Sequence, residues 1–220
     1  MPLKRTTAPC RQTVWKPTPN TTTSTFSPTA LQKNFFHLSL HPKQRYMKYK
    51  LIVLDLDGTL TNAKKEITPR NRETLIRMQE QGIRVVLASG RPTYGIVPLA
   101  NELRMNEFGG FILSYNGGEI IDWATQETVY ENVLPNEVVP VLYECARTHR
   151  LSILTYDGAE IITENPQDPY VQKEASLNKM AVRETNDFLT DITLPVAKCL
   201  IMGDADKLIP LEAELSLRLQ

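Results

Sequence analysis

The stretch LIVLDLDGTLTN, residues 51–62, predicts the first strand of this chain and the turn that follows it. A short apolar run leads into Asp55, and one leucine separates Asp55 from Asp57. Such a run is typical of a strand buried on both faces of a sheet. Residues two apart in a strand face the same side, so the two aspartates are expected to project together from its end. Gly58 allows a tight turn directly after them.

The chemistry of this aspartate pair follows from its spacing. Two carboxylates this close repel each other, so their pKa values are expected to separate. A bound Mg²⁺ would relieve the repulsion, because it is a hard cation that prefers oxygen ligands. The pair also suits a nucleophilic carboxylate beside a general acid and base. Exposed amides in the turn at Gly58 could hold phosphate oxygens.

Helical and strand patterns alternate after this strand. We expect a helix in residues 68–82, with Thr68 as its N-cap and Gly82 as its stop. Further predictions are a buried strand in 83–90, a helix in 91–105 that Pro98 kinks or delays, a third strand within 109–118, and a hairpin in 119–133. Strand and helix at this spacing predict a parallel sheet with right-handed crossovers. Ligands of such sheets lie at the carboxyl ends of the strands.

The pattern changes at Leu134. The following elements are expected: a helix in 134–150, two strands in 151–163 joined at Asp157–Gly158, a helix in 168–179, a strand in 195–203 and a helix from 204 onward. An Asp-Gly pair between two apolar runs is a typical hairpin turn. The mixture predicts a second, smaller α/β layer inserted into the first.

Residues 1–46 differ in composition from the rest. They are rich in Thr, Ser and Pro and show no sustained periodicity. Too little apolar surface is available to offset the entropy of ordering, so we expect disorder or a misassigned start of the chain. Three interpretations stay open: translation that begins at Met47, a real tail, or an organelle transit peptide, which is typically basic, hydroxyl-rich and poor in acidic residues.

Charge, cysteine content and hydropathy exclude several classes of protein. Residues 1–50 contain nine Lys or Arg and no acidic residue, which leaves 16 basic and 25 acidic residues beyond them, a net formal charge of −9. An acidic body disfavours nucleic acid as a partner. The three scattered cysteines argue against a disulfide framework and favour a cytoplasmic location. No apolar run approaches the roughly 18 residues of a membrane helix, so we expect no membrane partner.

The longer pattern around Asp55, an apolar run followed by D-x-D-G-T and a leucine, resembles the nucleophile motif of the haloacid dehalogenase (HAD) superfamily. The closest resemblance is to its Cof-type sugar-phosphatase branch. LASGRP, residues 87–92, matches the second motif of the family, and YNGG, residues 115–118, also fits the branch. The resemblance implies a Rossmann-like parallel sheet with helices on both faces in residues 47–133, and an α/β cap domain in 134–220.

The resemblance also implies roles for individual residues. Asp55 would attack phosphorus and form an aspartyl-phosphate, while Asp57 would protonate the leaving alcohol and later activate water. The Asp55 carboxylate and the Asp57 backbone carbonyl would bind Mg²⁺. The remaining implied roles are phosphate binding by Gly58, Thr59, Ser89, Gly90 and Arg91, and a place at the substrate mouth for Asn116 and Gly117.

Two further motifs of the family have no match in this sequence. The family uses a lysine between nucleophile and phosphate, and a G-D-x-x-N-D-like loop that completes the metal site. In IMGDADK, residues 201–207, no Asn-Asp pair follows Gly203 and Asp204, so we interpret Asp204 or Asp206 as a helix N-cap. The chain is therefore predicted to end within an incomplete cap. Its sheet would have an open edge and an exposed apolar face, and the chain alone would be weakly active or inactive.

The sequence thus predicts a Mg²⁺-dependent phosphatase acting on a small phosphorylated metabolite, such as a sugar phosphate. One alternative is a phosphomutase-like phosphotransferase, which would transfer the phosphoryl group to a second sugar hydroxyl rather than to water. The other is a non-catalytic fragment that binds phosphate ligands. Neither the particular substrate nor the oligomeric state follows from the sequence.

Overall fold

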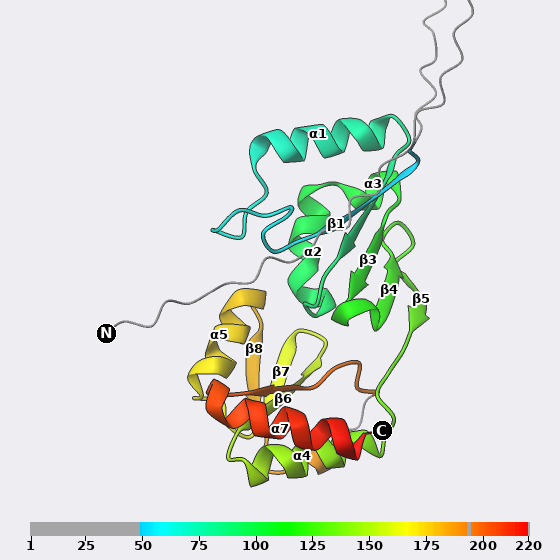
Figure 1. Ribbon diagram of the computed structural model, residues 1–220. Coiled ribbons are helices and arrows are strands. Elements are labelled where there is room, and N and C mark those ends of the chain that lie inside the picture. Colours follow the sequence, from blue (N-terminus) through cyan, green and yellow to red (C-terminus); the bar gives the residue numbers. More distant parts are fainter. Residues whose placement is uncertain (1–48, 193–194, 220) are drawn as a thin grey trace, which may run out of the picture. The chain divides into compact units, whose positions relative to one another are not determined.

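The structure, a computed structural model, describes residues 49–192 and 195–219, and the predictions for residues 1–46 lie outside these ranges. The described strands form two sheets (Figure 1). One has five strands in the order β1-β2-β3-β4-β5, and the other has four in the order β8-β7-β6-β9. Helices accompany both sheets. The α/β fold class predicted from the sequence is therefore confirmed.

The elements of the first sheet occur in nearly the predicted order. Its elements are β1 (Leu51–Asp55), α1 (Pro69–Glu80), β2 (Arg84–Ala88), α2 (Thr93–Glu102), α3 (Met105–Phe108), β3 (Phe111–Ser114), the 3-10 turn η1 (Tyr115–Gly117), β4 (Glu119–Asp122) and β5 (Glu127–Glu131). Strands β1, β2 and β3 pair in parallel, as predicted. Strands β4 and β5 then extend the sheet as the predicted antiparallel hairpin.

Local sequence sets the bounds of α1. Thr68 precedes the helix in an extended conformation, and its Oγ1 accepts a hydrogen bond from the Asn71 N–H at 3.3 Å, which confirms the N-cap. Pro69 occupies the start of the helix, where its missing N–H has no intrahelical partner to lose. The helix ends at Glu80, two residues before Gly82. Its buried face includes Leu75, which turns the helix toward the sheet.

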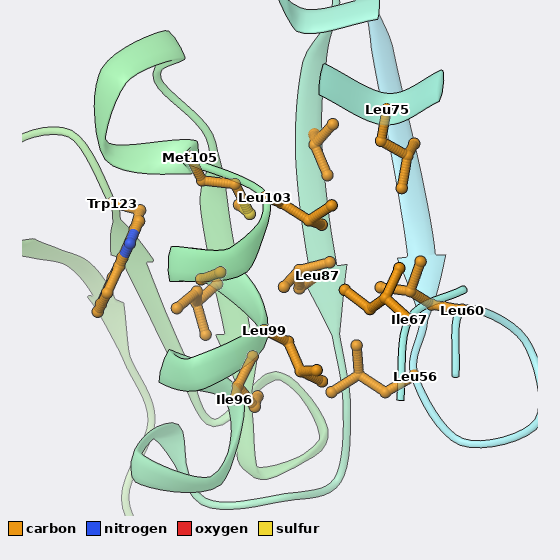
Figure 2. Packing of buried hydrophobic residues seen from close by; sticks show 13 residues of the cluster. Leu56, Leu60, Ile67, Leu75, Leu87, Ile96, Leu99, Leu103, Met105 and Trp123 are labelled. Atoms are coloured by element: carbon orange, nitrogen blue, oxygen red, sulfur yellow. The ribbon is translucent and has the colours of Figure 1, made fainter. Parts of the chain in front are cut away.

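The helices beside the first sheet pack on one face of it (Figure 2). Leu87 of β2 and Ile112 of β3 are neighbours in the sheet and join one buried cluster. Leu75 of α1, Leu99 of α2 and Met105 of α3 belong to the same cluster. Successive strand residues face opposite sides of a sheet, so this apolar packing lies on a single face.

The opposite face of β1 corrects two predictions. Leu51 is 46% exposed and Val53 is 53% exposed, so β1 is not buried on both faces as its apolar run predicted. Helices were also expected on both faces, whereas α1, α2 and α3 all contribute to the single cluster. An apolar run predicts a strand, but each face of that strand is buried only where another element packs against it. Among the described strands, β1 lies at the edge of its sheet, and Leu51 and Val53 expose apolar surface, so both predicted features are present within the described ranges.

Beyond Leu134 the structure contains the second sheet and its helices, which include every element predicted there. The observed elements are α4 (Val138–Thr148), β6 (Ser152–Asp157), β7 (Glu160–Thr163), α5 (Pro169–Asn178), β8 (Ala181–Glu184), α6 (Phe188–Asp191), β9 (Leu200–Met202) and α7 (Ala205–Arg218). The predicted hairpin of β6 and β7 is confirmed. The sequence missed three short elements, α3, β8 and α6, of which β8 pairs in parallel with β7.

The second sheet is covered on both faces. Ile153 and Leu154 are consecutive in β6 and therefore point to opposite sides. Ile153 packs with Ala146 of α4 and Phe188 of α6, whereas Leu154 packs in a separate cluster with Val171 of α5. Helix α7 contacts α4 and adds Leu211 to a further small cluster. The central strand β6 is therefore buried from both sides.

Two smaller observations complete the fold. Asp204 occupies the N-cap position of α7, as predicted, but its carboxylate accepts the Tyr170 hydroxyl at 2.8 Å and caps no helix amide. Among the helices that the structure describes, none has the length and apolar character needed to cross a membrane.

Candidate active site

The carboxyl ends of the three parallel strands lie level with one another. Asp55 of β1 aligns with Ala88 of β2, and Ala88 aligns with Leu113 of β3. The loops that follow these strands carry the three motifs singled out in the sequence. This edge is where ligands bind in parallel α/β sheets, so the candidate site begins here.

Two cations hold the side chain of Asp57. The Arg91 guanidinium donates from Nε to Oδ2 at 2.9 Å and from Nη2 to Oδ1 at 2.6 Å. The Lys65 ammonium donates to Oδ1 at 2.8 Å. The side chain of Arg91 is only 8% exposed, whereas that of Asp57 is 36% exposed. Because a bidentate pair fixes the orientation of both groups, Asp57 joins the loop after β1 to the loop after β2.

These contacts also govern the protonation of Asp57. The side-chain hydrogen bonds from Arg91 hold the pKa of Asp57 below its ordinary value, and Lys65 adds to this effect. Partial burial acts in the opposite direction, because it disfavours the charged form. The carboxylate form of Asp57 is therefore favoured while both cations remain in contact with it.

Asp55 differs from Asp57 in having a free carboxylate. It is exposed at the end of β1, and no side chain in the described ranges donates a hydrogen bond to its carboxylate. The next residue, Leu56, is fully buried, so exposure alternates along Asp55, Leu56 and Asp57. Gly58 then adopts φ +85°, a left-handed conformation that favours glycine. The Asp55 carboxylate is left open to a ligand that arrives from solvent.

The Ser-Gly-Arg loop is fastened to the turn that follows β3. The Asn116 N–H donates to the Ser89 carbonyl at 3.1 Å, and the Tyr115 N–H donates to the Arg91 carbonyl at 3.0 Å. A Cβ at Gly90 would lie 2.5 Å from Asn116 Oδ1, so a larger residue at this position would require the Asn116 side chain to move. Tyr115 and Asn116 both have positive φ, at 51° and 59°. Two such residues in sequence are costly and persist only where the surroundings hold them.

The structure therefore brings some of the predicted site residues into contact with one another, and, within the described ranges, it places the others in the same turns without such contacts. Asp57 contacts Arg91 directly, and Ser89 and Gly90 contact Asn116. Thr59 is exposed in the turn after β1, and Gly117 closes the turn after β3 with φ +89°. The roles assigned to these residues in phosphate and substrate binding stay predictions.

The strand-end aspartates were also predicted to bind Mg²⁺. Within residues 49–192 and 195–219, no group of three or more His, Cys, Asp or Glu lies close enough to hold a metal ion. The oxygen donors nevertheless fit, because Mg²⁺ is usually held by one or two carboxylates together with water and substrate phosphate. Asp55 supplies a free carboxylate, whereas the carboxylate of Asp57 is occupied by Arg91 and Lys65. For Asp57, only the backbone carbonyl oxygen is left to coordinate Mg²⁺.

Sequence reasoning missed two lysines at this edge. Lys65 contacts Asp57, and the Lys198 ammonium donates to the Gly90 carbonyl at 2.9 Å. Lys198 also lines a cavity of about 210 Å³ together with Tyr115 and Tyr156, whose ring centroids are 5.8 Å apart. Neither lysine belongs to a recognisable motif, so only their placement in the fold identifies them.

Comparison with known proteins identifies the family of this chain. Residues 52–220 match the family model described as haloacid dehalogenase-like hydrolase. A solved haloacid dehalogenase-like hydrolase from Bacteroides thetaiotaomicron is 86% identical with a TM-score of 0.76, and the match covers 79% of this chain and 65% of that chain.

Two curated relatives carry phosphatase names. Pyridoxal phosphate phosphatase YbhA of Escherichia coli (strain K12) is 28% identical over 120 residues, which are 54% of this chain and 43% of the relative. The 5-amino-6-(5-phospho-D-ribitylamino)uracil phosphatase YcsE of Bacillus subtilis (strain 168) is 29% identical over 100 residues, 46% of this chain and 39% of the relative. The chain thus spans less than half the length of either relative. On the family match across residues 52–220, the chain belongs to the haloacid dehalogenase-like hydrolases.

Proposed function

We propose that this chain carries the nucleophile and phosphate-binding loops of a Mg²⁺-dependent phosphatase for small phosphorylated metabolites. The observation that carries this proposal is the pairing of Asp57 with Arg91, which joins the D-x-D-G-T loop to the Ser-Gly-Arg loop. Membership of the family and the phosphatase names of its relatives support the same reaction class.

The proposed reaction has two steps. In the first, a carboxylate oxygen of Asp55 attacks phosphorus, and the bond from phosphorus to the leaving oxygen breaks as that oxygen takes a proton from Asp57. In the second, Asp57 takes a proton from water, the water oxygen attacks phosphorus, and the bond to Asp55 breaks to release phosphate. The exposed Asp55 carboxylate, with no described donor, suits the role of nucleophile.

The cations around Asp57 must redistribute for this reaction. Asp57 has to carry a proton in the first step, yet Arg91 and Lys65 favour its ionised form. The planar guanidinium of Arg91 can bind two phosphoryl oxygens with the same fork geometry that binds two carboxylate oxygens. An arriving phosphate monoester would therefore compete for Arg91 and release Asp57 to hold a proton.

The remaining residues would bind and orient the phosphoryl group. Mg²⁺, when bound, would neutralise charge on the phosphoryl oxygens, and the Asp55 carboxylate and Asp57 carbonyl are the donors that would hold it. Hydrogen bonds to the phosphoryl oxygens would come from the Ser89 hydroxyl and from backbone amides of the turn after Asp57. The proposed binding set also includes Gly58, Thr59, Gly90 and Arg91, with Asn116 and Gly117 at the substrate mouth.

The test is the substitution Asp55→Asn, which removes the nucleophile with little change in shape. We expect loss of phosphate release from phosphate monoesters in the presence of Mg²⁺. We also expect that mass spectrometry after an acid quench no longer detects a phosphorylated form of the peptide that contains Asp55. Asp206→Asn is the matched control, because Asp206 is an exposed aspartate in the first turn of α7. It should leave both readouts unchanged.

Product analysis separates the proposal from its competitors. Inorganic phosphate as the product supports a hydrolase, whereas a phosphorylated second sugar hydroxyl would identify a phosphomutase-like transferase. Phosphate release that persists at full rate in Asp55→Asn would contradict the proposed nucleophile. Ligand binding without turnover in the unsubstituted chain would favour a phosphate-binding role instead.

A further inference from the structure

Two hydrogen bonds position Lys198, one made by its backbone carbonyl and one by its side-chain ammonium. The Thr155 hydroxyl of β6 donates to the Lys198 carbonyl at 3.0 Å, which fixes the backbone just before β9. The ammonium then reaches across to the Gly90 carbonyl at 2.9 Å. Gly90 lies between Ser89 and Arg91, so a side chain from the second sheet region ends beside the proposed phosphate-binding loop.

The ammonium of Lys198 lacks an ion-pair partner within the described ranges. Burial lowers its pKa, and the carboxylate of Glu174 opposes this effect only in part. Glu174 already accepts hydrogen bonds from Tyr156 Oη and Asn178 Nδ2, each at 2.8 Å. An ammonium has three donors, and a half-buried polar donor is costly to leave without an acceptor. The side chain is therefore suited to bind oxygen atoms of a ligand.

The cavity that Lys198 lines limits the size of such a ligand. Its volume is about 210 Å³, below the range of roughly 300–1,000 Å³ that is usual for drug-sized ligands. The rings of Tyr115 and Tyr156 contribute to its wall and are tilted by 53° to each other. Aromatic rings offer flat apolar surface to a ligand, and a flavin-sized group would exceed this space.

The charges around the cavity limit the chemistry of the ligand. Glu119, Glu131 and Asp157 line it together with the single ammonium. Asp157 is paired with Arg183 at 3.0 Å, and Glu119 accepts the Ser114 hydroxyl at 3.2 Å, so these two carboxylates are fixed in place. Three carboxylates against one ammonium repel a second anionic group but accept hydroxyl hydrogens.

We propose that Lys198 is a specificity-determining residue that binds the leaving group of the substrate, and that this cavity takes a small neutral polyol. The inference rests on the proposed phosphatase function and deepens it. The phosphoryl group would lie against the Ser-Gly-Arg loop, and the sugar-like leaving group would extend to Lys198 and the two tyrosines. Monophosphates of small polyols are then favoured over bisphosphates and over flavin-sized esters.

The test compares four esters with the full chain in Mg²⁺: the monophosphate of glucose, fructose bisphosphate, flavin mononucleotide and para-nitrophenyl phosphate. Lys198→Met should lower kcat/KM for the glucose ester about 10- to 100-fold, the usual effect of losing a hydrogen bond to a charged group. Turnover of para-nitrophenyl phosphate, which has no hydroxyl on its leaving group, should be nearly unchanged. Lys198→Arg should restore part of the loss.

The matched control is Lys173→Met, because Lys173 is an exposed lysine of α5 in the same region. It should leave all four rates unchanged. An equal loss for every ester in Lys198→Met would identify a structural contact and overturn the inference. Equal kcat/KM for the glucose ester and fructose bisphosphate in the unsubstituted chain would overturn the predicted charge selectivity.

Binding measurements keep this inference separate from the proposed function. Calorimetric titration of the Asp55→Asn chain with the glucose ester does not depend on turnover, and adding Lys198→Met should weaken binding by a similar factor. Such binding without turnover in the unsubstituted chain would reject catalysis by this chain alone and retain the polyol site. Turnover with no dependence on Lys198 would reject only the site. Absence of both would reject both.

Discussion

The two sheets of this molecule differ in how far they bury the apolar residues of their strands. Strand β1 has the more continuous apolar run, yet Leu51 and Val53 on one of its faces are about half exposed. Strand β6 contains serine, threonine and tyrosine, yet its residues Ile153 and Leu154 are buried in clusters on opposite faces. The difference lies in the helices, since α4 and α6 cover one face of β6 and α5 covers the other.

This comparison teaches that strand hydrophobicity and strand burial are separate properties. An apolar run records what a strand can bury, whereas its actual burial depends on the elements packed against each face. In the first sheet those elements all lie on one side, and β1 is at the edge. At the carboxyl end of β1, the ion pairs of Asp57 with Arg91 and Lys65 add to the apolar packing of the buried Leu56 and Leu60 in holding the loop.

The largest effect that tests this comparison is expected from Leu154→Ala. Leu154 is fully buried, so truncation should lower the free energy of unfolding by about 2–5 kcal/mol through lost transfer energy and a residual cavity. Val53→Ala is the counterpart in the first sheet and should cost less than about 1 kcal/mol, because Val53 is about half exposed. Urea denaturation of both variants measures the difference.

Similar losses from the two substitutions would break the comparison. They would mean that Val53 is covered in solution by something that the described residues do not include. Val53→Thr serves as the control for shape, since it keeps β-branching while adding a hydroxyl on the exposed face. It should be nearly neutral if the face is open to water.

Helix caps provide a second and smaller test of the same contrast. Thr68 caps α1 beside the first sheet, and Thr68→Ala should cost about 1 kcal/mol. Asp168 caps α5 by accepting the Tyr170 N–H at 2.8 Å and also accepts the hydroxyl of the buried Ser152 at 2.6 Å. Asp168→Ala should therefore cost about 2 kcal/mol or more, because it also leaves Ser152 without this acceptor.

The controls are Thr68→Ser and Asp168→Asn, which retain an oxygen at the capping position. Both should lie close to the unsubstituted chain in thermal unfolding. If Thr68→Ala proved as costly as Asp168→Ala, the link between α5 and the interior of the second sheet would not be the source of the extra stability.

Much of the fold could be predicted because its signals are local. Thr68 and the glycine after α1 mark the helix ends, and Asp157–Gly158 marks the turn between β6 and β7. Strand β8 was missed because its four residues, AVRE, contain little apolar periodicity and gain their pairing from β7. The cover of β1 could not be predicted, since it depends on which side each helix packs.

The candidate site divides in the same way. Asp55 ends a strand, Asp57, Ser89 and Arg91 lie just after strands, and all four belong to motifs, so the sequence identified them. The direct pairing of Arg91 with Asp57 was not predicted, because Arg91 was expected to bind phosphate. Lys65 and Lys198 carry no motif, and only the folded loop after β1 and the backbone position set by Thr155 bring them to the site.

The smallest expected effect concerns the ion pair that holds the end of the first sheet. Arg91 is the main cause of the lowered pKa of Asp57, and the Lys65 hydrogen bond contributes less. Arg91→Gln should therefore raise the pKa of Asp57 more than Lys65→Met does, as measured by the pH dependence of its carboxyl carbon signal in NMR. A larger shift from Lys65→Met would contradict the assignment of Arg91 as the principal partner.

The stability consequence follows from the sign of this shift. A folded-state pKa below the ordinary value of 3.8 means that the pair stabilises the fold above that pH, and that this stabilisation is lost as the pH falls through the folded-state value. The effect should be small, because Asp57 is partly exposed and solvent screens the pair. Hydrogen exchange during acid titration should then detect opening of the loop after β1, while amides of β6 remain protected. Simultaneous loss of protection in both would show that the two sheets unfold as one unit, and the contrast in their packing would have no separate consequence for stability.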